Sequence, residues 1–78
     1  MTDAMFDRVV VELRKQLAIY NAGVELEVDV YRQAISLSLG SKGTFSITRA
    51  NLNTMGATPR EIAETYYWRY RQVLASPR

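Results

Sequence analysis

The chain of 78 residues contains no cysteine and no histidine, is 47% hydrophobic and has a formal net charge of +2. A chain of this length forms one domain, residues 1–78, and its composition excludes disulfide bonds, thiolate metal sites and histidine as a general base. Because so small a domain buries a modest share of its surface, we expect a partner or a second copy to cover some of its apolar surface.

The charge is unevenly distributed along the sequence. Residues 1–30 hold six acidic and three basic side chains (net −3), whereas residues 31–78 hold seven basic and two acidic ones (net +5). Such a distribution can steer an anionic partner or favour head-to-tail self-association. The sequence begins with acidic residues rather than with a basic signal peptide, and no stretch approaches the ~20 apolar residues of a membrane span. We therefore expect a soluble, cytoplasmic protein with no membrane contact.

Residues 3–21 have the periodicity of an amphipathic helix. Asp3 and Asp7 lie near the positive end of the helix dipole, and Gly23 tolerates the left-handed conformation that ends many helices. The apolar side chains that share one stripe of this helix are Phe6, Val9, Val10, Leu13, Leu17 and Tyr20.

The pattern then changes to strict alternation. VELEVDV at residues 24–30, AISLSLG at 34–40 and TFSIT at 44–48 each alternate apolar with polar side chains, and GSKG supplies a turn between the last two. This pattern predicts a three-stranded antiparallel meander with one solvated face. A helix is the alternative for residues 24–39, where Val24, Val28, Tyr31, Ile35 and Leu39 also share a helical stripe. We favour strands because β-branched residues dominate the start of the segment.

The first predicted strand has an acidic face. Glu25, Glu27 and Asp29 would point to the same side, and their oxygens could in principle bind a hard cation. A straight strand spaces them widely, so we expect a solvated acidic face and no metal or other cofactor.

The remaining segment contains two helical signals. RANLNTMG reads as one or two helical turns closed by Gly56, and in TPRE the residues Thr58, Pro59 and Glu61 form an N-cap, a first helical position and a capping box. The last helix should span residues 59–75. The predicted fold class is α+β: an N-terminal helix, a three-stranded antiparallel meander, a short helical turn and a C-terminal helix, with both main helices on the apolar sheet face.

The segment YYWRYRQ, residues 66–72, combines aromatic residues with arginine. At ~100° per residue, Tyr66, Tyr67 and Tyr70 fall on the apolar face of the last helix with their hydroxyls at its rim, whereas Trp68 falls on the opposite, polar side. A loop could half-cover Trp68, but tryptophan is also enriched at binding hot spots, and arginine beside it suits anionic or aromatic partners. The predicted partner-binding residues are Trp68, Arg69, Arg71, Glu64 and Gln72.

No nucleophile–base pair, phosphate loop or dinucleotide motif stands out, so we expect no enzyme. The favoured function is a small protein-interaction module, an adaptor, assembly factor or inhibitor, that binds a protein partner or itself as a homo-oligomer through the exposed face of the last helix. The alternative is a nucleic-acid-binding accessory protein that uses residues 48–71 as a helix-turn-helix-like segment. Low net charge and exposed acids in that segment count against it. Its contacts would come from Arg49, Arg60, Arg69 and Arg71.

One segment has a familiar form. GSKGTFSITRANLNTM, residues 40–55, resembles the hairpin-to-helix junction of small phage head–tail joining proteins, whose order of helix, hairpin and helix is also similar. The resemblance implies a phage-encoded, non-enzymatic structural or adaptor protein that acts in the host cytoplasm. It transfers no site residues.

Overall fold

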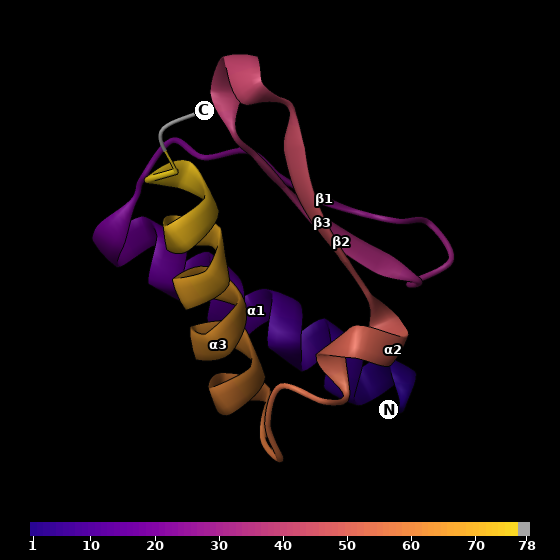
Figure 1. The fold of residues 1–78 in the computed structure, drawn as a ribbon. Helices are drawn as coiled ribbons and strands as arrows, with labels where there is room; N and C mark the ends of the chain where they lie inside the picture. Colours follow the sequence, from indigo (N-terminus) through magenta and orange to yellow (C-terminus); the bar gives the residue numbers. More distant parts are fainter. Residues whose placement is uncertain (77–78) are drawn as a thin grey trace.

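A computed structural model describes residues 1–76 of the chain and has the predicted α+β architecture (Figure 1). In chain order the elements are α1 (Asp3–Tyr20), β1 (Leu26–Val28), β2 (Ala34–Ser38), the 3₁₀ turn η1 (Gly40–Lys42), β3 (Thr44–Thr48), α2 (Arg49–Leu52) and α3 (Pro59–Leu74). None of the helices formed by residues 1–76 is long and apolar enough to cross a membrane.

The alternating segments form the predicted antiparallel meander, in the order β1-β2-β3. The register pairs Leu26 with Leu37 and Ile35 with Ile47, so apolar side chains meet on one face of the sheet. On the other face the Ser36 hydroxyl donates to the hydroxyl of Ser46 at 3.0 Å. Residues 24–39 are therefore two strands and their turn, and not the alternative helix.

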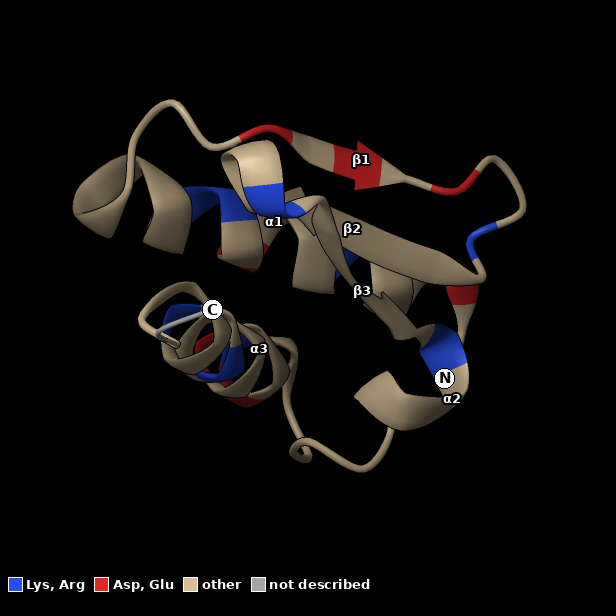
Figure 2. Cartoon of the chain, turned by 45° about the horizontal axis from the view of Figure 1, so that its top comes forward, with Lys and Arg blue, Asp and Glu red and all other residues tan. Residues whose placement is uncertain are grey.

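Helices α1 and α3 pack against each other and lie on one side of the sheet (Figure 2). The buried side chains form a single cluster between the helices and the sheet: Phe6, Val9, Leu13, Leu17, Ile35, Leu37, Ile47, Leu52, Met55, Ile62, Ala63, Tyr66, Tyr67 and Tyr70. The expected core positions of the three tyrosines are confirmed.

The sequence predicted that the tyrosine hydroxyls lie at the rim of the helix face. Two of them instead bond to the sheet. The Tyr66 hydroxyl donates to the carbonyl oxygens of Ile35 and Phe45, the latter at 2.9 Å, and the Tyr70 hydroxyl donates to the Ser38 carbonyl at 2.7 Å. Burial raises the pKa of both hydroxyls. These bonds satisfy polar groups that would be costly to bury unpaired, and they fix α3 on the sheet.

The start of α3 is set by local sequence. Thr58 accepts a hydrogen bond from the Glu61 amide at 3.2 Å and its hydroxyl donates to the Glu61 carboxylate at 3.1 Å, and Pro59 occupies the first turn. The chain passes so close to this turn that a Cβ on Gly56 would lie 2.7 Å from the Cβ of Glu61. The approach to α3 therefore requires glycine.

The end of α3 is held from the turn between β2 and β3. The Lys42 ammonium donates to the carbonyl oxygens of Leu74 and Ser76 at 3.2 and 3.0 Å. At this end of the helix no later backbone amides are available to donate to these carbonyls. A cation here also complements the helix dipole.

Two predicted core positions are wrong. Strand β1 ends at Val28, so Val30 lies in the following turn and is 83% exposed instead of facing the core. Tyr20 is the last residue of α1, at the edge of the interface with α3, and it is 62% exposed. Val73 and Leu74, at the other helix end, are also only partly covered.

Candidate functional site

Trp68 lies on the outer side of α3 and is 64% exposed. Tyr67 and Tyr70, its neighbours along the helix, point into the core, because successive residues on a helix are turned by about 100°. No loop covers the indole among residues 1–76. A large exposed aromatic side chain on a packed helix is the first feature of the site.

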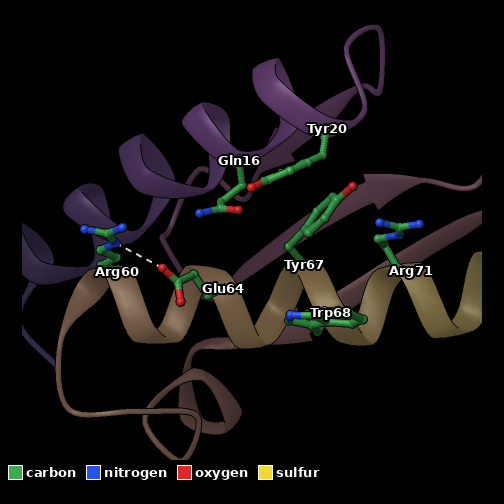
Figure 3. Close-up of a pocket in the computed structure, with 7 residues that line it drawn as sticks. All are labelled: Gln16, Tyr20, Arg60, Glu64, Tyr67, Trp68 and Arg71. Atoms are coloured by element: carbon green, nitrogen blue, oxygen red, sulfur yellow. Dashed lines mark hydrogen bonds and ion pairs between the residues drawn. The ribbon is translucent and has the colours of Figure 1, made fainter.

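A groove of about 350 Å³ runs between α1 and α3 beside Trp68 (Figure 3). It brings together side chains from two helices that are far apart in the sequence. Its lining residues are Gln16 and Tyr20 of α1 and Arg60, Glu64, Tyr67, Trp68 and Arg71 of α3.

Stacked aromatic rings form one wall of the groove. Tyr67 is 5% exposed, and the ring of Tyr20 stacks on it with centroids 5.8 Å apart and planes inclined at 28°. Tyr20 thus covers Tyr67 with one side of its ring and leaves the other side open. Together with Trp68 it offers aromatic surface from both helices to an incoming side chain.

The charged groups of the groove are arginine and glutamate. The Arg60 Nε bonds to the Glu64 carboxylate at 3.0 Å, and both side chains remain solvated. Arg71 has no ion-pair partner within residues 1–76. With two arginines and one glutamate the lining has an excess of positive charge, so an acidic group beside an apolar one would suit it.

The structure brings together three of the five predicted partner-binding residues. Glu64, Trp68 and Arg71 line the groove, whereas Arg69 and Gln72 are exposed but lie outside the lining. The sequence-based prediction missed the contribution of α1. Gln16 and Tyr20 are spaced i, i+4 and so share one side of the helix, but nothing in the sequence shows that this side faces α3.

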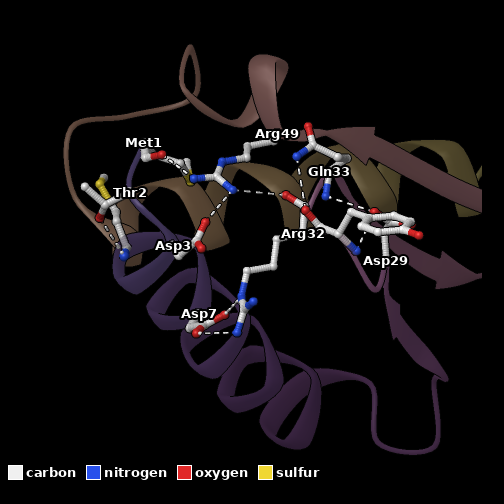
Figure 4. A network of polar contacts seen from close by, with 10 residues as sticks. Met1, Thr2, Asp3, Asp7, Asp29, Arg32, Gln33 and Arg49 are labelled. Carbon is white, nitrogen blue, oxygen red and sulfur yellow. Dashed lines mark hydrogen bonds and ion pairs between the residues drawn. The ribbon is translucent and has the colours of Figure 1, made fainter.

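The helix-turn-helix-like segment predicted for residues 48–71 contains the short helix α2 and most of α3. Helix α2 has only four residues, and Arg49 at its start is turned inward. Its guanidinium bonds to the Asp3 carboxylate at 2.8 Å and to the Met1 carbonyl oxygen (Figure 4). It also lies 5.6 Å from the centre of the Phe6 ring. These contacts already occupy its guanidinium, whereas Arg60, Arg69 and Arg71, the other arginines of the nucleic-acid alternative, are exposed on α3. The nucleic-acid alternative stays a prediction.

We call Asp3, Asp7, Arg32 and Arg49 the polar network. In it Arg32 bonds to the Asp7 carboxylate at 2.9 Å, as Arg49 does to Asp3. The hydrogen bond from Arg49 lowers the pKa of Asp3, and the hydrogen bond to Asp7 raises the pKa of Arg32. The network ties the start of α1 to the β1–β2 turn and to α2.

The acidic strand face is shallow. Glu25 and Glu27 line a depression of about 60 Å³ with Ser36, Ser38 and Thr44, while Asp29 turns away into the β1–β2 loop. Residues 1–76 contain no group of three acidic side chains placed to hold a metal ion.

Comparison of the chain with protein-family models, with curated proteins and with solved structures finds no match. The resemblance of residues 40–55 to phage head–tail joining proteins therefore stays a prediction. Locally, the segment consists of the turn η1, strand β3 and helix α2, which Thr48 caps by accepting from the Asn51 amide at 3.3 Å.

Proposed function

We propose that this protein is a small non-enzymatic interaction module that binds a protein partner, or another copy of itself, in the groove between α1 and α3. The observation that carries the proposal is Trp68: it is largely exposed, and it lines a shaped groove together with Tyr20 and Arg71 instead of standing alone on a flat surface. Tryptophan, tyrosine and arginine are the residues most enriched at the energetic centres of protein interfaces.

The size and chemistry of the groove favour a short peptide segment as its ligand. Its volume lies near the lower end of the ~300–1,000 Å³ typical of ligand pockets, enough for one or two side chains. The rings of Tyr20 and Trp68 suit an apolar or aromatic side chain, and Arg71 suits a neighbouring carboxylate. The groove therefore favours a segment in which an aromatic residue lies next to an acidic one.

Binding rather than catalysis also agrees with the residues available. The chain has no histidine, the most frequent general base, and no cysteine, and within residues 1–76 the lining of the groove contains no serine, threonine or lysine that could serve as a nucleophile. An adaptor, an assembly factor and an inhibitor each need only a binding surface. A phage-encoded structural protein would be one example of such a binder. The cysteine-free composition is compatible with the cytoplasm as the place of this interaction.

A peptide selection tests the proposal with ligands drawn from random sequence. A library of random peptides displayed on their own mRNA is selected on the wild-type protein and, in parallel, on the Trp68→Ala variant. We expect peptides enriched only on the wild type to combine aromatic with acidic residues and to bind at least about tenfold more weakly to Trp68→Ala, a loss of ~1.4 kcal/mol.

Arg69 and Arg71 provide a matched control for the same peptides. Both are exposed arginines of α3, but only Arg71 lines the groove. Arg71→Ala should weaken the selected peptides and Arg69→Ala should not. Equal binding to the wild type and to Trp68→Ala, or no enrichment at all, would refute the proposal.

A further inference from the structure

The loop between β1 and β2 presents two adjacent apolar side chains, Val30 and Tyr31, which we call the tip. Val30 is 83% and Tyr31 79% exposed, the highest values among the large hydrophobic residues. Neither side chain contributes to the core, and because they are adjacent they form one continuous apolar surface, the kind of feature that marks interaction sites when it is large enough.

The tip is held in one conformation by its own hydrogen bonds. The Asp29 carboxylate accepts from the amides of Tyr31 and Gln33 at 3.1 and 3.2 Å, and the Gln33 side-chain amide donates to the Tyr31 carbonyl at 3.0 Å (Figure 4). Arg32 adopts a left-handed conformation with φ of 55°. A loop ordered in advance loses little conformational entropy when it binds, which favours its use as a contact element.

The polar network fixes the same loop to the body of the molecule. Arg32 bonds to Asp7 of α1, and Arg49 donates to the Arg32 carbonyl at 3.4 Å. Val30 and Tyr31 therefore project from a base that is attached on the side of α1.

The tip has the chemistry that the groove favours. Tyr31 and Val30 supply an aromatic and an aliphatic side chain, and the acidic Asp29 and Glu27 precede them. The groove supplies aromatic surface and the arginines Arg60 and Arg71. Glu27 and Asp29 are thus opposite in charge to the arginines of the groove, and Arg32 of the same loop is already paired with Asp7.

A single molecule cannot place its tip in its own groove. Figures 1 and 2 both show the β1–β2 loop at the end of the molecule away from α3, and the loop is anchored to α1 on that side. A contact between the two features must join two molecules. Because the two surfaces differ, a dimer joined in this way keeps one free groove and one free tip. Further copies can bind there, and association continues into a chain or closes into a ring.

We propose that Val30 and Tyr31 of one molecule occupy the α1–α3 groove of a second copy of this chain, so that the protein associates head to tail. The inference rests on the proposed function of the groove and names its occupant. A contact built on two side chains and one groove is small, so the association should be weak and rise with protein concentration.

Two variants with complementary defects test this contact. A tip variant, Val30→Ser with Tyr31→Ser, keeps its groove, and a groove variant, Trp68→Ala, keeps its tip. In sedimentation velocity at rising concentration, we expect the wild type to form dimers and larger species and each variant alone to stay monomeric. An equimolar mixture should form a dimer and nothing larger, because it offers one usable tip and one usable groove per pair.

Circular dichroism and thermal unfolding establish that each variant is folded, and Val11→Ser, at another exposed apolar position, is the matched control that should associate like the wild type. A tip variant that associates normally, or a mixture that stays monomeric, would overturn the inference. Loss of association in Trp68→Ala alone would then indicate groove-to-groove pairing and leave the proposed function standing. A wild type that stays monomeric at every concentration would also overturn the inference, and the peptide selection would still decide the proposed function by itself.

Discussion

Two regions of this molecule combine arginine with aromatic side chains, and they use the combination differently. In the polar network, Arg49 is 19% exposed, packs over Phe6 and bonds to Asp3. In the groove, Arg71 lies near Trp68 and has no ion-pair partner within residues 1–76. The same residue types thus stabilise the fold where another part of the chain supplies a carboxylate, and remain available to a partner where none does.

The largest expected difference between the two regions concerns folding stability. Arg49→Ala should lower the free energy of unfolding by about 1–2 kcal/mol, because it removes bonds to Asp3 and to the Met1 carbonyl and the contact with Phe6. Arg71→Ala should change it by less than about 0.5 kcal/mol. Urea unfolding of both variants measures the difference, and equal effects would show that the distinction between the regions is wrong.

The inner side of α3 provides a reference for its outer side. Tyr66→Phe removes a hydroxyl that bonds to Ile35 and Phe45, so it should destabilise by about 1 kcal/mol, whereas Trp68→Ala should change stability by less than about 0.5 kcal/mol. Thermal and urea unfolding test both values. A larger effect of Trp68→Ala would make the indole a structural residue and weaken the case for the groove.

The raised pKa of Tyr66 also predicts the response to alkaline pH. The unfolded tyrosine ionises near its ordinary pKa of about 10, while the buried hydroxyl stays protonated to higher pH. Its contribution to stability is therefore complete below pH ~10 and declines above it. Tyr66→Phe should decline less steeply in urea unfolding above this pH, and a slope identical to that of the wild type would contradict the assignment.

A smaller effect of acid should appear only in the polar network. The hydrogen bond from Arg49 lowers the pKa of Asp3, so this contribution is present above the ordinary pKa of about 3.9 and is lost as pH falls through the lowered value. Asp3→Asn should lose less stability than the wild type in this range. Arg71→Ala, in the groove, should keep the wild-type profile, and urea unfolding from neutral to acid pH compares the three proteins.

The smallest effect concerns the solvent around Trp68, the only tryptophan. Under conditions where the protein is monomeric, its emission should be quenched more by iodide than by caesium, because arginine attracts the anion. Arg71→Ala should reduce this preference more than Arg69→Ala, since side chains three apart on a helix are neighbours and adjacent ones are not. Equal quenching by both ions would contradict the positive charge of the groove.

The sequence predicts features set by local order. The TPRE segment predicts the start of α3, and strict alternation of apolar and polar residues predicts the strands. Helical spacing predicts that Trp68 lies outside the core. The errors involve contacts between distant residues or the ends of elements. The Arg49–Asp3 bond joins residues 46 positions apart, and no local pattern distinguishes that arginine from Arg71. The groove likewise needs α1, whose orientation toward α3 is decided only when both helices pack on the sheet.

The C-terminal turn of α3 is held by Lys42, a residue of a different element. The last turn of a helix ordinarily frays by itself, because its carbonyls have no partners. Here the ammonium that binds those carbonyls belongs to the turn between β2 and β3. Opening the end of α3 therefore also breaks hydrogen bonds to the hairpin, so the amides of this turn should exchange with solvent more slowly than those of an unsupported helix end.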